Sequence, residues 1–468
     1  MDRNDVMDGE RILSSLGLEP KNGKSQVPQP SANGTKPPAA EELGCFYDHA
    51  RKGFWAKDHH GEWVEFTETQ FKRLLRSRGL SSEIWPTPML NQLEDKLLEL
   101  QHSQSCHFAG EVAGWLPGLH TICGQRILVT KGPVIPAPKE KPWPTLKKLI
   151  AELLGDEQKH FHAWMQSALL SLKAGSPFRP GQLLAIAGPA GCGKSLLQGL
   201  VTELLGGRSA KPYAFLVGDS NFNAHLFRAE HLMIEDEPAS IDMRARRHLA
   251  AAVKGLCVNT TQQFHRKGKE PIPMEPFWRL TITLNDDQDH LMVLPPMDDS
   301  LLDKVILLRA RPASFPFDSD QLDARKLYRA TLSAELPGYL FWLKRWRMPA
   351  ELKDQRYGCK AYQNDALLKG LQDLDPEHKL WTLIQALGVV EPGQAWEGTA
   401  AKLELVLREK DRSGDISRIL YYNTACGGYL AKLAKRYPAN FQQLRHTKGL
   451  MRWRISADDE LPDVELPD

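Results

Sequence analysis

The sequence predicts an α/β fold in which a mainly parallel β-sheet, formed within residues 181–316, is covered by helices. Three observations predict this fold. Strand-like apolar runs alternate with segments of helical period through this range, which is typical of parallel strands joined by helices. The first run, Leu183–Ala187, leads directly into a glycine-rich loop and then into a helical segment. Two later runs, at 232–234 and 279–284, each end in polar side chains.

Other segments flank this core. The stretch 21–41 is rich in Pro, Ser, Asn and Gly and cannot bury enough apolar surface to offset its ordering entropy. In chain order we expect a disordered arm over 1–40, a small mixed α+β N-terminal domain over 44–136, a helical connector over 144–180, the core over 181–316, a helical segment over 317–370, a winged-helix domain over 373–457 and an acidic tail over 458–468.

Two of these segments carry clear helical patterns. In the N-terminal domain, Thr67 can cap a helix that places Phe71, Leu74 and Leu75 on one face. The connector shows two apolar stripes at helical spacing. The stripes consist of Leu146, Leu149, Ile150, Leu153 and Leu154, and of Phe161, Trp164, Met165, Ala168 and Leu172.

The composition is that of an ordinary globular protein. The 468 residues are 42% apolar and 25% charged, which suits two or three domains. The formal net charge is only +2, so nucleic-acid binding would need locally clustered basic groups. None of the seven cysteines forms a Cys-x-x-Cys pair, which favours neither a disulfide framework nor a zinc ribbon. No secretory signal or membrane-spanning run is recognised, so we expect a cytoplasmic protein without a membrane partner.

The glycine-rich loop has the pattern Gly-x-x-x-x-Gly-Lys-Ser between a strand and a helix, the context that gives this motif its meaning. Its glycines let backbone N–H groups point at phosphate oxygens, and the helix N-terminus adds partial positive charge. Lys194 can reach the β- and γ-phosphates of ATP, and the Ser195 hydroxyl can bind Mg²⁺. The predicted nucleotide-binding residues are Gly188, Pro189, Ala190, Gly191, Cys192, Gly193, Lys194 and Ser195.

Polar side chains after the next two apolar runs complete a candidate ATPase site. Asp236 is predicted to hold the magnesium ion and Glu237 to polarise the attacking water. A shift of one residue stays open, because successive side chains of a strand face opposite sides. Asn285 is predicted to orient the same water without altering the charge balance. The alternatives are a solvated acidic turn at 235–237 and an ordinary turn at Asn285.

Together, these motifs resemble those of superfamily 3 helicases. The order GPAGCGKS, LMIEDE and TITLND, with Val253–Pro276 between the last two, is similar to motifs A, B, B-prime and C of that family. Its members are AAA+ hexamers of viruses, phages, plasmids and other mobile elements. The similarity extends over about 181–457, where ELPGYLFWLKRWRMPAELKDQRYGCKAYQND looks like the helical segment of phage-type primase–helicases. The resemblance implies an AAA+ core, ATP hydrolysis and a homo-hexameric ring that moves 3′ to 5′ on single-stranded DNA.

In that family the segment equivalent to Val253–Pro276 includes a hairpin that grips DNA in the central channel. The resemblance places Lys254 before the hairpin, and a basic tip around Gly268. The tip would consist of His265, Arg266, Lys267 and Lys269. The residues alone point the same way, because a dense positive run on a nearly neutral protein can pair with phosphates. A solvated basic loop is the alternative.

The family also supplies an arginine finger from the neighbouring subunit, and here the sequence departs from the pattern. At the expected place Lys304 follows Asp303, and a lysine lacks the planar fork of arginine. Arg309 and Arg311 follow the next apolar run. Lys304, Arg309 and Arg311 are therefore all candidates for the catalytic finger.

The segment 373–457 predicts three helices followed by a hairpin, the order of a winged helix. Lys432, Lys435 and Arg436 lie on the outward face of the third helix, and the hairpin turns near Lys448. These four basic residues are candidates for DNA contacts. A winged helix that contacts only protein is the alternative.

The main hypothesis is a replicative or initiator helicase that uses ATP and acts on single-stranded and forked DNA. Its candidate partners are a primase, a polymerase and a single-strand-binding protein. The alternative is an ATP-gated origin scaffold or loader without strong unwinding activity. A primase–helicase is disfavoured, because residues 44–136 show no carboxylate constellation for a polymerase-type primase.

Overall fold

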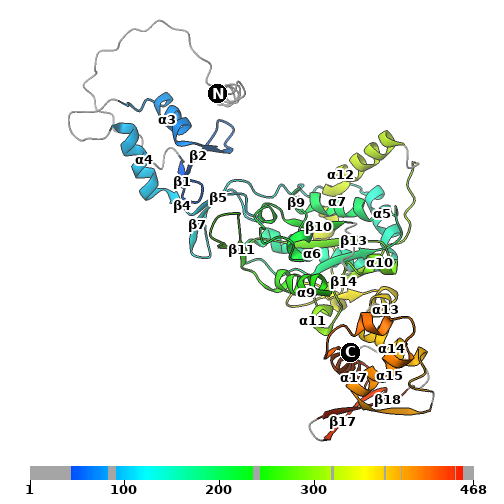
Figure 1. Cartoon of the computed structure of the whole chain (residues 1–468). Coiled ribbons are helices and arrows are strands. Elements are labelled where there is room, and N and C mark those ends of the chain that lie inside the picture. Colours follow the sequence, from blue (N-terminus) through cyan, green and yellow to red (C-terminus); the bar gives the residue numbers. More distant parts are fainter. Residues whose placement is uncertain are drawn as a thin grey trace, which may run out of the picture.

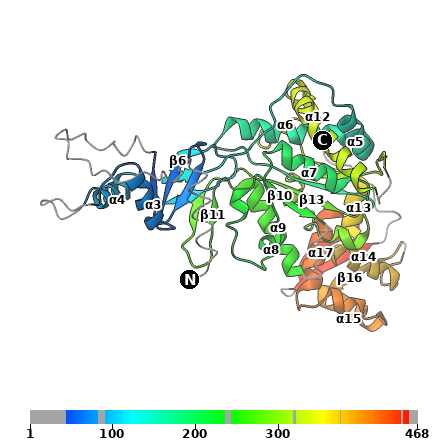
Figure 2. The ribbon, with the colours of Figure 1, turned by 90° about the horizontal axis from the view of Figure 1, so that it is seen from above.

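The computed structural model describes residues 44–82, 91–235, 243–317, 321–373, 376–391, 393–447 and 450–456. Three groups of elements follow one another along the chain (Figure 1). N-terminal strands and helices come first, a central parallel sheet with its helices second, and a helical C-terminal unit last. The N-terminal and C-terminal groups lie on different sides of the central sheet in both views (Figure 2).

The central sheet has six parallel strands in the order β15-β14-β8-β13-β10-β9. Their bounds are β8 Leu183–Ala187, β9 Ser209–Ala210, β10 His231–Glu235, β13 Arg279–Leu284, β14 Val305–Arg309 and β15 Tyr362–Gln363. The predicted parallel sheet is therefore confirmed. Strand β15 was not expected, because the sequence favours helix over 317–370. Its two residues pair with β14, a tertiary contact that no local periodicity announces.

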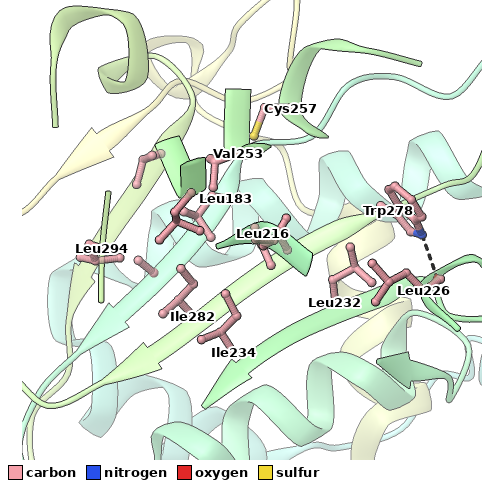
Figure 3. Close-up of a cluster of buried hydrophobic side chains, with 14 of the residues drawn as sticks. Leu183, Leu216, Leu226, Leu232, Ile234, Val253, Cys257, Trp278, Ile282 and Leu294 are labelled. Carbon is pink, nitrogen blue, oxygen red and sulfur yellow. Dashed lines mark hydrogen bonds between the residues drawn. The ribbon is translucent and has the colours of Figure 1, made fainter. Parts of the chain in front are cut away.

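The strands of this sheet are apolar because both faces are covered. Leu183 and Ala185 of β8 belong to one buried cluster, whereas Leu184 and Ile186 belong to a second on the opposite face. Figure 3 shows part of the first cluster, including the Trp278 indole N–H that donates to the Leu226 carbonyl at 3.1 Å. The helices α8 Tyr213–Leu216, α9 Met243–Val258 and α13 Asp365–Asp373 contribute to this first cluster.

Four helices contribute to the second cluster: α5 Pro144–Leu154, α6 Gln158–Ala174, α7 Lys194–Leu204 and α12 Leu322–Arg345. Both apolar stripes predicted for α5 and α6 are buried. Proline at the first position suits the start of α5, where its missing N–H has no helical partner to lose. The short helices η1 Gly155–Glu157, η2 Leu226–Arg228, α10 Gln288–Leu291, α11 Asp299–Leu302 and η3 Ala350–Leu352 connect the longer elements.

The N-terminal segment forms two sheets. The first, in the order β3-β2-β1-β4, packs against helices α3 and α4, and the second has the order β5-β7-β6. Their bounds are β1 Phe46–Asp48, β2 Gly53–Lys57, β3 Trp63–Phe66, α3 Glu68–Ser77, α4 Gln92–Ser103, β4 Ser105–Cys106, β5 Phe108–Gly110, β6 Gly118–Ile122 and β7 Gln125–Val129. Thr67 caps α3 as predicted. The second sheet shares its core with the central sheet, since Phe108, Ile127 and Val129 pack into the first cluster.

The C-terminal unit consists of helices and a three-stranded antiparallel sheet in the order β16-β18-β17. Its elements are α14 Pro376–Ala386, β16 Ala395–Thr399, α15 Ala400–Lys410, α16 Asp415–Ile419, α17 Ala425–Arg436, β17 Phe441–Thr447 and β18 Leu450–Ser456. The three helices and the hairpin are those that the sequence predicts, while β16 and α16 are additional. Leu430 and Leu433 of α17 are buried.

All seven cysteines are free thiols, and six of them are buried. Among the helices of the described segments, none combines the length and the apolar character needed to cross a membrane.

Candidate nucleotide and nucleic-acid site

The glycine-rich loop lies between β8 and α7, as predicted. Gly191 and Gly193 have φ angles of 71° and 112°, which residues with a side chain rarely adopt. Gly188 is required for a different reason. A Cβ atom there would lie 2.5 Å from the carbonyl oxygen of Ala310, so the chain after β14 passes directly against the loop. Each motif glycine therefore has a local structural reason.

Lys194 is the first residue of α7, and its side chain contacts the loop. Its side chain is buried, and its Nζ donates to the carbonyl oxygens of Gly188 and Pro189, each at 2.8 Å. The same Nζ donates to Asn285 Oδ1 at 3.2 Å. Two residues 91 positions apart, both predicted for the site, are thus in direct contact.

The sheet order explains this contact. Strand β13 is hydrogen-bonded to β8 on one side and to β10 on the other, with Leu284 beside Ala187. Asn285, which follows β13, therefore lies at the same edge of the sheet as the loop, which follows β8. Strand β10 ends at the same edge, with Glu235 beside Thr283. Asp236 and Glu237 follow immediately and lie outside the described residues.

The other loop residues differ in exposure. Pro189, Ala190 and Ser195 are exposed, while Cys192 is buried. No side chain caps the N-terminus of α7, so side chains leave the first N–H groups of this helix available to other acceptors. The Ser195 hydroxyl at this helix start is a hard oxygen donor of the kind that Mg²⁺ prefers.

A buried polar network beneath α7 was not found by sequence reasoning. Gln198 Nε2 donates to Thr281 Oγ1 at 2.7 Å and to the Ile234 carbonyl at 3.3 Å, and Gln198 Oε1 accepts from Thr283 at 3.2 Å. Gln198 therefore joins the loop helix to β10 and β13. The signal available in the sequence was a polar residue on the apolar face of a predicted helix.

His231 extends this network on β10. Its ring nitrogens lie 2.7 Å from Thr202 Oγ1 and 2.8 Å from Thr281 Oγ1. Burial lowers the pKa of His231 to about 3, because the charged imidazolium would be desolvated. The ring is therefore neutral at neutral pH and acts here as a hydrogen-bonding bridge.

The three finger candidates lie in different places. Lys304 precedes β14 at the sheet edge opposite the loop, and its Nζ donates to the Ser300 carbonyl at 2.8 Å and to Asp303. Arg309 ends β14 beside Ala187, and its Nη2 lies 3.6 Å from Asp286 Oδ2. The Arg311 guanidinium packs against the backbone of Gly155. The structure therefore does not bring these three side chains together.

A hairpin is present within Val253–Pro276, formed by β11 Gln262–Phe264 and β12 Ile272–Met274, which pair antiparallel. Lys267 and Lys269 are exposed in the connecting turn, where Gly268 has a φ of 69°. Lys254 lies on α9 and forms an ion pair with Asp298 at 3.5 Å.

Arg266, the third basic residue predicted near Gly268, is only partly exposed. Its guanidinium lies over the rings of Phe108 and Phe264, 5.3 and 5.5 Å from their centroids. Burial lowers the pKa of Arg266, although the group stays charged. The physical reason is that β5 packs against the hairpin, so the side chain of this arginine lies over aromatic rings and is partly shielded from solvent.

An exposed aromatic residue beside the hairpin was also missed. Phe222 is 40% exposed, and its ring centroid lies 5.2 Å from that of His265. Asn223 fixes this loop to the hairpin, since its Oδ1 accepts from the His265 N–H at 2.8 Å and its Nδ2 donates to the Gln263 carbonyl at 2.8 Å. Phe222 and His265 therefore form a firmly held pair of rings next to the two tip lysines.

In the C-terminal unit, Lys432 and Lys435 are exposed on α17, and Lys432 Nζ forms an ion pair with Glu377 at 2.9 Å. Arg436 lies over the ring of its neighbour Tyr437. Lys448 lies outside the described residues. Sequence reasoning missed Arg452 and Arg454 of β18, which lie near Glu397 at 3.6 and 4.0 Å.

Comparisons with known proteins give a fold but no activity. Residues 186–300 match a family model described as a family of unknown function, DUF5906. No curated protein matches the chain.

Among solved structures, one apo structure of the NrS-1 C-terminal region is 12% identical with a TM-score of 0.53, covering 89% of this chain and 97% of that one. A second structure of the same region, its A form, is 13% identical with a TM-score of 0.51, covering 89% and 98%. The two proteins share a fold. At this identity the likeness says nothing further about function. A structure of SCCmec type IV Cch, described as an active helicase, covers 85% of this chain and 73% of that one, at 11% identity. Its TM-score of 0.32 is too low to carry an argument.

Proposed function

We propose that this chain is the motor of an ATP-dependent DNA helicase of the superfamily 3 AAA+ type, which works as a ring on single-stranded DNA. The observation that carries the proposal is the contact between Lys194 and Asn285 at the loop edge of a parallel sheet. The strand that leads to Asp236 and Glu237 ends at this edge as well. A chance glycine-rich turn gives no reason for Lys194 to contact Asn285 at an edge where β10 also ends.

The proposed chemistry assigns one task to each residue. Lys194 leaves the loop carbonyls to bind the β- and γ-phosphates, and the uncapped N–H groups of α7 bind phosphate oxygens. Ser195 and Asp236 would hold Mg²⁺, which supplies charge neutralisation between the phosphates when bound. Glu237 takes a proton from the attacking water, and Asn285 orients that water. A neighbouring subunit supplies a basic side chain, as the resemblance implies.

The proposed DNA contact is the turn between β11 and β12. Lys267 and Lys269 pair with phosphates, and the rings of Phe222 and His265 offer a surface on which bases stack. Neither contact reads a base edge, so binding is expected to be independent of sequence and to weaken with salt.

A second candidate function is an ATP-gated DNA-binding scaffold. The exposed basic residues on α17 and β18 support it, because they lie in a unit separate from the hairpin and suit duplex DNA bound by a winged helix. In that case ATP drives assembly of the protein on DNA, and little unwinding follows.

Unwinding of a forked DNA by the full-length protein separates the two functions. The test compares the wild type with Lys194→Ala and with the double variant Lys267→Ala, Lys269→Ala. A second double variant, Lys353→Ala with Lys360→Ala, removes the same charge from exposed positions outside the hairpin segment. The helicase proposal expects no ATP hydrolysis by Lys194→Ala. It expects hydrolysis without unwinding by the hairpin variant, and wild-type unwinding by the charge control.

Two results would reject the helicase. Hydrolysis and DNA binding by a wild type that unwinds nothing would establish the scaffold instead. Equal unwinding by the wild type and the hairpin variant would remove the hairpin from the mechanism.

A further inference from the structure

The side chain of Arg309 lies beside the nucleotide loop of its own chain. Arg309 is the last residue of β14 and is paired in register with Ala187, the residue that precedes the loop. The next residue, Ala310, donates its N–H to the Ala187 carbonyl at 2.7 Å and passes within contact distance of Gly188. This backbone is fixed further by Glu157, whose Oε2 accepts the Arg309 N–H at 2.8 Å.

The charged group that the Arg309 side chain contacts directly follows a residue of the same site. Its Nη2 lies 3.6 Å from Asp286 Oδ2, and Asp286 directly follows Asn285, which contacts Lys194. A carboxylate at this position would repel a polyphosphate, and its charge is compensated only if a cation stays close. Arg309 is half-exposed and Asp286 is one-quarter exposed, so the guanidinium can move toward an incoming anion while remaining near Asp286.

We propose that Arg309 acts in cis, as the residue that balances the charge of Asp286 in the nucleotide site of its own subunit. It is therefore not the trans-acting finger. The inference rests on the proposed ATPase function and assigns a new role within that site. Lys304 differs in a decisive way, because it lies at the other end of β14, one strand length of about 16 Å away by the usual rise per residue.

The first test measures binding of a fluorescent ATP analogue at protein concentrations at which the wild type is a monomer. A residue that acts in trans cannot contribute under these conditions. Arg309→Ala is expected to weaken binding about tenfold, the effect of losing one charge-assisted contact of about 1.4 kcal/mol. The double variant Asp286→Asn, Arg309→Ala is expected to recover most of this loss, because the uncompensated carboxylate is then gone.

A matched control is Arg356→Ala. Arg356 is also half-exposed and forms a similar ion pair, 3.8 Å from Asp303, at the opposite end of β14. Its loss is expected to leave monomer binding unchanged. Wild-type affinity of Arg309→Ala would overturn the cis role. A double variant that binds no better than Arg309→Ala would overturn the charge-balancing role.

The second test mixes Arg309→Ala with Lys194→Ala subunits and measures ATP hydrolysis after subunit exchange. If Arg309 acted in trans, random mixing would create intact interfaces at about a quarter of the sites of a ring. The cis role expects none, so activity stays at the average of the two parent variants. Recovery toward a quarter of the wild-type rate would overturn the inference. A wild type that binds nucleotide but does not hydrolyse it would reject the proposed function, while the binding test would still decide the role of Arg309.

Discussion

Three buried histidines are expected to make the central unit sensitive to acid. His160 and His162 lie on α6, His231 lies on β10, and all three are buried. Burial lowers the pKa to about 4 for His160 and His162 and to about 3 for His231, because each site disfavours the charged ring. For His160, the nearby charge of Lys159 adds to this effect.

The direction of the effect follows from proton uptake. Below pH 6.5 the unfolded chain binds protons at these rings, whereas the folded chain does not, so stability is lost as the pH falls from 6.5 toward 4. At pH 5 each histidine costs about 2 kcal/mol relative to neutral conditions, and the three together cost about 6 kcal/mol. That sum is comparable to the whole stability of a typical domain.

His160→Phe isolates one of these contributions. The imidazole is stacked on Tyr362 with centroids 3.9 Å apart, and its Nδ1 has no hydrogen-bond partner among the described residues. A phenyl ring can keep the stacking without binding a proton. The free energy of unfolding from urea titrations is therefore expected to stay within about 1 kcal/mol of the wild type at pH 8. Between pH 8 and pH 5, the free energy of unfolding of the variant should rise by about 2 kcal/mol relative to that of the wild type.

The control is His107→Phe, which makes the same replacement at an exposed position. It shows whether any exchange of histidine for phenylalanine changes the dependence on pH. Identical losses of stability between pH 8 and pH 5 in the wild type and His160→Phe would refute the reasoning.

Three further predictions concern the site. Gln198→Leu is expected to lower the free energy of unfolding by about 2–4 kcal/mol in urea titrations, because buried partners on β10 and β13 lose their hydrogen bonds; an unchanged value would show that these bonds contribute little. Gly188→Ala is expected to abolish nucleotide binding in a fluorescence titration, since its Cβ would meet the Ala310 carbonyl at 2.5 Å; normal affinity would mean that this chain segment moves freely. Phe222→Ala is expected to weaken binding of a labelled single strand by about 1–3 kcal/mol in anisotropy, with recovery in Phe222→Tyr; equal losses in both variants would exclude stacking.

The amino-acid sequence by itself determined the local elements of the site. Gly188–Ser195 was identifiable because a strand, a glycine-rich loop and a helix are adjacent in the chain, and its chemistry follows from the types and spacing of its residues. The apolar stripes of α5 and α6 were predictable for a similar reason, since a helical period is a local property. Asn285 could be placed at a strand end, and the parallel sheet then suggested which edge it shares.

Only the tertiary structure decided which of these residues meet. The contact of Lys194 with Asn285 depends on β13 lying between β8 and β10, an order that the sequence does not encode locally. The sequence left all three finger candidates open, whereas the two ends of β14 place Lys304 and Arg309 at opposite edges of the sheet. Arg266 is basic in any reading, but the rings of Phe108 and Phe264 cover it because distant segments pack there. The type of a residue defines what chemistry it can do, whereas long-range packing decides which partners and how much solvent it meets.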